Sequence, residues 1–167
     1  MSVALPAVLS ALAVLLLYLS GLIPSGKWAV VAVAGLCPAA AVVSAGLLAG
    51  GLTYASAGIL AFLLAPNKGN VLLFVLFFGL YPVVKSLIER LKKLPLEIFC
   101  KMVFFNGILT LFYFAFASLL MPALPELLKN SVPLLYLAAN IIFGVYDLGF
   151  TKLMGFYRVR IDKVIRR

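Results

Sequence analysis

The chain has 167 residues, of which 65% are hydrophobic and only 11% are charged, and its mean hydropathy is +1.20. Soluble domains carry about a quarter charged residues, so this composition excludes a soluble globular domain. The net charge of +9 could suit a nucleic-acid-binding protein, but the basic residues flank long apolar segments, which favours an anionic membrane surface as their partner. The sequence therefore predicts one all-α integral membrane domain over residues 1–167, a bundle of six transmembrane helices.

Residues 3–23 form the first apolar segment. About 21 residues at about 1.5 Å each cross the roughly 30 Å of bilayer hydrocarbon. A secretory signal peptide would carry basic residues before its apolar core, and no charged residue precedes Val3. We therefore expect a helix that stays in the membrane, followed by a tight turn at residues 24–27.

Residues 28–66 contain no charged residue, and their length requires two spans. As one helix this segment would be about 58 Å long, roughly twice the hydrocarbon thickness. The glycines of residues 46–51 (GLLAGG) predict the turn, which gives spans at about 28–45 and 48–66. Pro38 is expected to kink the first of these two helices.

The fourth span is expected at about residues 71–86, with Asn70 as its N-cap and a loosened turn at Tyr81 and Pro82. Apolar residues then recur at helical spacing opposite the basic ones. They are Leu87, Ile88, Leu91 and Leu94. This pattern predicts a short helix that lies in the membrane interface and ends at Pro95.

The last two spans are expected at about residues 98–121 and 132–157, and the basic residues orient all six. Eleven of the fourteen Lys and Arg residues lie in residues 85–101 or from Lys152 onward. Cytoplasmic segments collect such residues, so both termini and the basic connector are predicted to be cytoplasmic. Five spans would place the connector and the tail on opposite sides of the membrane.

Several polar residues fall within or at the ends of the apolar segments, where a charge costs about 3 kcal/mol or more. They are Lys85, Glu89, Lys101, Asn106, Asn140 and Asp147. One interpretation is an ion pair of Asp147 with Lys101 or Lys85 that holds helices together. Another is a coupling site whose protonation or partner shifts the helices, and lone lysines could also extend toward the membrane surface. Asn140 is expected to make an interhelical hydrogen bond.

The chain lacks the residues of the common catalytic and metal sites. It has no histidine, which excludes Ser-His and Cys-His nucleophile pairs and histidine metal ligands. It has no phosphate-binding glycine loop and no pair of carboxylates within one span. Cys37 and Cys100 have no metal-site spacing, and we interpret them as packing residues. The sequence thus predicts neither an enzyme nor a cofactor.

Small residues recur four positions apart in the first half of the chain. They are Ala7 and Ala11, Gly46 and Gly50, and Ala57, Ala61 and Ala65. This spacing lets helix backbones approach closely, either within the protein or at a docking face for another subunit.

Six short spans, cytoplasmic termini and an alanine-spaced first helix resemble the substrate-binding S components of energy-coupling-factor vitamin transporters. The resemblance implies that Ala7 and Ala11 dock a transmembrane coupling subunit, which works with ATPase subunits in a bacterial cell membrane. It also implies an outward pocket for a vitamin-like solute that is closed by loops. Its candidate contacts are Trp28, Asn67, Lys68, Asn70 and Tyr136. The alternative is a non-transporting scaffold or assembly factor of a cell-envelope complex.

Overall fold

The computed structural model describes residues 4–117 and 131–160. These residues are almost entirely helical, and none of them lies in a β-strand. Six helical segments among them are long and apolar enough to span a membrane: Ala4–Leu22, Lys27–Ala45, Leu47–Leu64, Lys68–Leu91, Leu94–Ala115 and Val132–Val159. The all-α membrane architecture predicted from composition is confirmed.

The chain divides into two compact units. Unit 1 comprises Met1–Arg90 and Met154–Arg167, and unit 2 comprises Leu91–Leu153. Unit 1 therefore contains the first four spans and the last turns of the sixth, whereas unit 2 contains the fifth span and most of the sixth.

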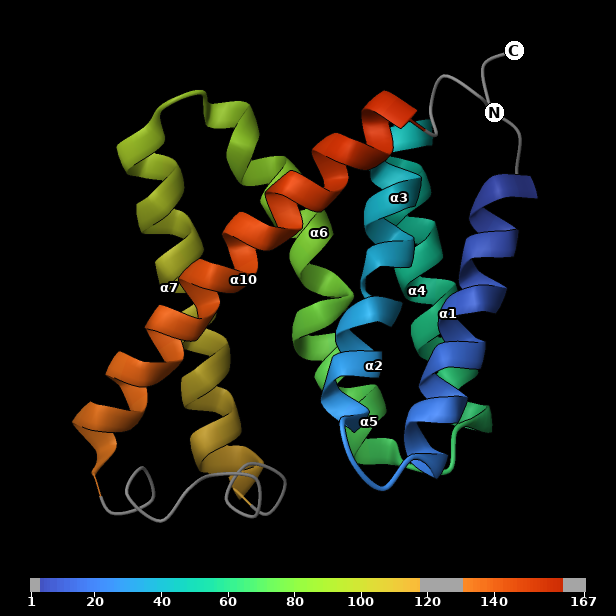
Figure 1. Ribbon diagram of the computed structural model, residues 1–167, viewed down its shortest axis with the longest axis horizontal. Coiled ribbons are helices and arrows are strands. Elements are labelled where there is room, and N and C mark those ends of the chain that lie inside the picture. Colours follow the sequence, from blue (N-terminus) through green and yellow to red (C-terminus); the bar gives the residue numbers. More distant parts are fainter. Residues whose placement is uncertain (1–3, 118–130, 161–167) are drawn as a thin grey trace. The chain divides into compact units, whose positions relative to one another are not determined.

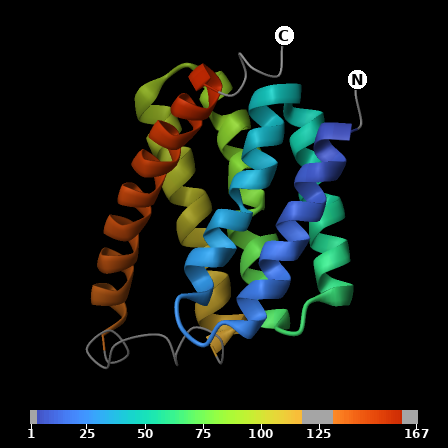
Figure 2. The same cartoon turned by 45° about the vertical axis from the view of Figure 1, so that its right-hand side comes forward.

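Unit 1 is organised around α1 (Ala4–Leu22) and α4 (Leu47–Leu64), which pack side by side (Figures 1 and 2). Their shared core is rich in alanine: Ala13 on α1 and Ala57 and Ala61 on α4 are fully buried. Lipid tails are as apolar as the side chains, so close van der Waals packing, rather than escape from water, holds membrane helices together. The alanines of α4 thus serve packing inside unit 1.

The second span is broken into α2 (Lys27–Ala34) and α3 (Leu36–Ala45). A proline cannot donate a backbone hydrogen bond to the residue four positions earlier, and its ring crowds that carbonyl group. Pro38 acts in this way on Ala34, so the interruption falls one turn before the proline itself. The chain then turns into α4 at Gly46, where φ is 92°, a value that favours glycine.

The fourth span begins earlier than its sequence pattern predicts and contains three segments. These are α5 (Lys68–Leu73), the π-helical η1 (Phe74–Phe78) and α6 (Leu80–Ile88). Asn70 was expected to cap this span, but the side chain of Asn67 does so, accepting the Asn70 N–H at 3.2 Å.

The π segment lies one turn before Pro82, which has no N–H to donate to the Phe78 carbonyl. The Gly79 N–H instead reaches back five residues to the Phe74 carbonyl at 2.7 Å. Such a widened turn is typical of a π-bulge in a helix. The loosening predicted near Tyr81 and Pro82 is therefore displaced toward the start of the helix.

The predicted interfacial helix ending at Pro95 is wrong. After α6 the chain forms a single 3₁₀ turn, η2 (Glu89–Leu91), and Lys92 adopts a left-handed conformation with φ 52°. The next helix, α7 (Leu94–Ala115), then starts with Pro95 in its first turn. Proline is favoured there because the first N–H groups of a helix have no intrahelical acceptor. Pro95 opens a span instead of closing one.

Unit 2 consists mainly of α7 and α10 (Val132–Arg160), which lie side by side and run in opposite directions (Figures 1 and 2). The last turns of α10, from Met154, belong to unit 1. There the hydroxyl groups of Tyr157 and Ser44 lie 2.9 Å apart.

Candidate functional site

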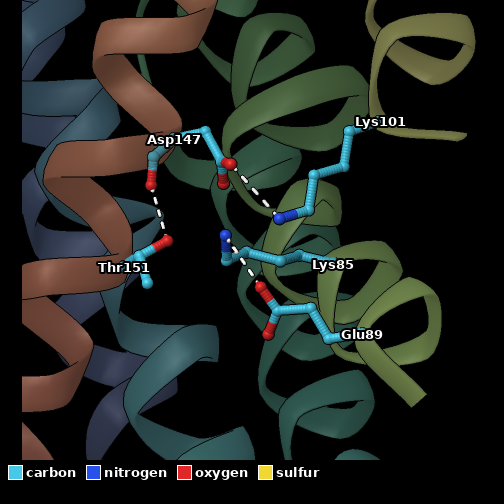
Figure 3. Close-up of polar contacts among 5 residues, drawn as sticks. All are labelled: Lys85, Glu89, Lys101, Asp147 and Thr151. Carbon is cyan, nitrogen blue, oxygen red and sulfur yellow. Dashed lines mark hydrogen bonds and ion pairs between the residues drawn. The ribbon is translucent and has the colours of Figure 1, made fainter. Parts of the chain in front are cut away.

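The acidic residue within the sixth span, Asp147, forms an ion pair in unit 2. Its Oδ2 accepts a hydrogen bond from Lys101 Nζ at 3.2 Å (Figure 3). The two side chains are only 19% and 11% exposed, respectively. Lys101, one of the two partners that the sequence allowed for Asp147, is thus paired with it within unit 2. A charge in a span needs such compensation because its insertion into hydrocarbon is costly.

A second ion pair lies within unit 1. Lys85 Nζ on α6 is 3.0 Å from Glu89 Oε1, one helical turn further along the chain (Figure 3). Lys85 is buried and its ammonium group lies 5.8 Å from the centre of the Tyr81 ring, which adds a cation–π interaction. Each basic residue that the sequence placed inside the fourth and fifth spans thus has a carboxylate partner in its own unit.

Two further polar contacts join α7 to α10. Asn106 and Asn140 exchange side-chain hydrogen bonds at 2.9 and 3.1 Å. The hydroxyl groups of Thr110 and Tyr136 lie 2.7 Å apart. We call these two contacts, with the Lys101–Asp147 ion pair, the polar ladder. Its order is antiparallel, because positions rise along α7 as they fall along α10.

An aromatic contact lies within the polar ladder. The rings of Phe105 and Phe143 are stacked, with centroids 4.4 Å apart and an interplanar angle of 5°. Interhelical hydrogen bonds and ring contacts add to van der Waals packing in holding membrane helices together. Tyr136, a candidate solute contact in the sequence, here serves helix association.

The other four candidate solute contacts lie at one end of unit 1. We call this end, which contains Trp28, Asn67, Lys68 and Asn70, the turn end. Trp28 lies in the first turn of α2, and the other three follow α4. Asn70 is buried, and its amide donates to the backbone oxygen and the hydroxyl of Ser20 on α1, both at 3.0 Å. The Lys68 ammonium donates to the Phe62 carbonyl and, at 3.0 Å, to the Ala65 carbonyl.

These bonds show how the sequence builds the turn end. Asn67 caps α5, Lys68 satisfies carbonyl groups at the end of α4, and Asn70 ties α5 to α1. Cations are favoured at helix C-termini because the last carbonyl groups carry partial negative charge. Three of the four candidates therefore stabilise the turn, and Asn70 is fully engaged in doing so.

The two alanines proposed for docking, Ala7 and Ala11, are exposed on α1. The opposite side of the helix is buried in unit 1 and contains Pro6, Ser10, Ala13, Leu17 and Ser20. The outer face of α1 thus carries small side chains that the core does not use.

Unit 1 also contains an apolar groove that the sequence did not indicate. Its volume is about 370 Å³. It is lined by Tyr54, Ala55, Gly58, Ile59, Phe62 and Leu63 of α4 and by Val75 of η1. The Tyr54 hydroxyl donates to the Val75 carbonyl at 2.9 Å, which joins α4 to the π segment. Hydropathy does not distinguish a π turn from an α turn, so no sequence signal locates this groove.

No metal centre is formed by the described residues, 4–117 and 131–160: no three His, Cys, Asp or Glu side chains among them lie close enough to share an ion. Protein-family models, curated proteins and solved structures give no match to this chain. Its function must therefore be argued from its own geometry and sequence.

Proposed function

We propose that the protein is the substrate-capturing subunit of a small-molecule uptake transporter in a bacterial cell membrane. The observation that carries this proposal is the outer face of α1, where Ala7 and Ala11 are exposed, whereas the spaced alanines Ala57 and Ala61 of α4 are buried. Small side chains on a lipid-facing helix permit close approach by a helix of another protein. The partner would be a transmembrane coupling subunit, as in the transporter family that the layout resembles.

The composition of the chain supports a division of labour between subunits. The sequence contains no phosphate-binding glycine loop, so ATP hydrolysis would come from separate ATPase subunits. The solute would bind at the turn end of unit 1. There the exposed Lys68 and the half-buried Trp28 and Asn67 offer an ammonium, an indole and an amide group. A vitamin-like solute with polar substituents suits these groups.

Replacement of the small residues tests the docking face. Ala7→Leu and Ala11→Leu should abolish co-purification of the coupling and ATPase subunits with the full-length chain in mild detergent, because the added side chains separate the helices. Ala29→Leu is the matched control, since Ala29 is an exposed alanine on α2. Equal recovery of those subunits with all three variants would rule out this docking face.

Solute capture is tested by thermal unfolding of the purified chain with a panel of water-soluble vitamins. A ligand that binds only the folded state stabilises it by RT ln(1 + [L]/Kd), about 2.7 kcal/mol at a free concentration a hundred times Kd, and so raises the unfolding midpoint. One vitamin should raise the midpoint, and Trp28→Ala should remove that effect. No shift with any vitamin would contradict solute capture.

A second candidate is a membrane scaffold that recruits partners of a cell-envelope complex. The observation that favours it is the engagement of Asn70 and Tyr136 in internal hydrogen bonds, which leaves fewer groups for a solute. The same purification separates the two functions. A scaffold brings down cell-envelope proteins without ATPase subunits.

A further inference from the structure

The apolar groove of unit 1 has a cationic end. Phe62, which lines the groove, lies beneath the Lys68 ammonium group, with 5.5 Å between the nitrogen and the ring centroid. Lys68 is exposed at the start of the fourth span. An ammonium group has three donors, and the Phe62 and Ala65 carbonyls accept two of them. One donor is left for a ligand.

No ion pair with Lys68 is formed by the described residues of unit 1, 4–90 and 154–160. The acidic residue among the described residues of unit 1 is Glu89, and its carboxylate is paired with Lys85. Glu89 is near the opposite end of the same span, about 30 Å from Lys68 along the helix. An anion that binds at the turn end is therefore attracted by the positive charge of the Lys68 ammonium group.

The groove has the length of one membrane leaflet. Its lining on α4 runs from Tyr54 to Leu63, which corresponds to about 14 Å of helix. Half of the roughly 30 Å hydrocarbon thickness is about 15 Å. The groove thus begins near the middle of the membrane and ends at the level where lipid headgroups start, next to Lys68.

The shape of the groove depends on the π segment. The Tyr54 hydroxyl bonds to the Val75 carbonyl and so fixes η1 beside α4. Gly58 keeps this contact close, since a Cβ there would lie 3.2 Å from Val75 Cγ2. π-bulges inside α-helices are frequently found at functional sites.

We propose that this groove binds an anionic phospholipid, with an acyl chain along α4 and the phosphate on Lys68. The apolar lining matches a hydrocarbon chain, its length matches one leaflet, and the ammonium group matches a phosphate. A zwitterionic lipid fills the groove equally well but gains less from Lys68, because its own cation offsets the attraction. This inference shares Lys68 with the proposed solute site but does not rest on solute capture, since it concerns a lipid of the bilayer and the groove on α4.

Native mass spectrometry of the full-length chain tests the proposal. The protein is released from detergent containing equal amounts of phosphatidylglycerol and phosphatidylcholine, and the bound lipids are counted. Phosphatidylglycerol should be retained as one molecule and about tenfold more tightly, the ratio expected for a charge-assisted contact. Lys68→Gln should abolish this preference and Lys68→Arg should keep it.

Matched variants distinguish binding at this site from the general effects of removing a lysine or enlarging a side chain. Lys27→Gln removes another exposed lysine from the turn end and should leave the preference intact. Ala55→Leu fills the groove and should lower retention of both lipids severalfold, whereas Ala29→Leu should not. The proposal is overturned if Lys68→Gln and Lys27→Gln lose the phosphatidylglycerol preference equally. It is also overturned if Ala55→Leu and Ala29→Leu retain lipid equally.

The lipid-binding test can also be distinguished from the test of solute capture. Ala55→Leu should leave any vitamin-induced shift and any co-purifying ATPase unchanged, because Ala55 lies outside the turn end and the face of α1. Thermal unfolding without added lipid verifies that each variant folds. Loss of lipid retention in Ala55→Leu with an unchanged vitamin shift locates the effect in the groove.

Discussion

At the residue scale, the Lys101–Asp147 pair shows how a charged residue is accommodated within an apolar span. The two side chains are mostly buried, so their mutual attraction is only weakly screened. A buried pair gains little over well-packed apolar residues, yet the loss of one partner leaves an uncompensated charge. The pair therefore specifies which faces of α7 and α10 meet more than it adds to stability.

A double-mutant cycle tests this role. Asp147→Leu should lower the free energy of unfolding by about 3 kcal/mol, because it removes the carboxylate that compensates the mostly buried ammonium group of Lys101. Addition of Lys101→Met should recover most of that loss. The measurement is reversible unfolding in mixed micelles. A double variant as unstable as the sum of its single variants would mean that the two charges act independently.

The sequence located the polar residues of the ladder but did not determine their partners. Asp147, Asn106 and Asn140 were recognisable as polar groups that need partners in lipid. The pairing of Asp147 with Lys101 depends on how far α7 slides along α10, and spacing within one helix does not contain that register. The sequence is limited in the same way for the candidate solute contacts. Whether Asn70 is exposed or buried depends on where α1 ends, because Asn70 bonds to Ser20 near that end.

At the element scale, the spans were predictable and their internal breaks were only partly so. Apolar length gave six spans, and proline and glycine indicated where helices turn. The π turn and the 3₁₀ turn at residues 89–91 were not predictable, because both preserve helical hydropathy while changing only which carbonyl accepts each N–H. The groove was missed for this reason.

Glycine substitutions test the packing between elements. Gly35, at the break of the second span, has no room for a Cβ because the Phe78 backbone lies against it. Gly35→Ala should destabilise the protein by about 2 kcal/mol, as overpacking does. Gly51→Ala is the control within α4, where a Cβ meets nothing within 4 Å. It should be neutral or stabilising by about 0.5 kcal/mol. Equal effects of the two variants would show that the close contact at Gly35 contributes nothing.

At the scale of the whole molecule, the predicted orientation depends on the basic residues. Ten of the Lys and Arg residues that fix it lie in residues 85–101 or from Arg158 onward, and Lys152 makes the eleventh. The turns at residues 23–26 and 65–67 carry none, and Lys27 and Lys68 follow them directly. With six spans, the distribution of basic residues predicts that the turn end of unit 1 faces outward and that η2 faces the cytoplasm. The solute proposal requires this orientation, since capture from outside needs Trp28 and Asn67 on the outer surface.

Cysteine labelling in intact cells tests the orientation. In a chain whose native cysteines are replaced, Ser25→Cys should react with a membrane-impermeant maleimide, because Ser25 is exposed in the turn between α1 and α2. Arg90→Cys is equally exposed on η2 and should react only after the membrane is permeabilised. The two positions lie at opposite ends of unit 1, and three spans, the second to the fourth, separate their water phases in the predicted topology. Labelling of Arg90→Cys in intact cells would reverse the orientation and remove the turn end as a site of solute capture, while the lipid site would move to the inner leaflet and keep its test.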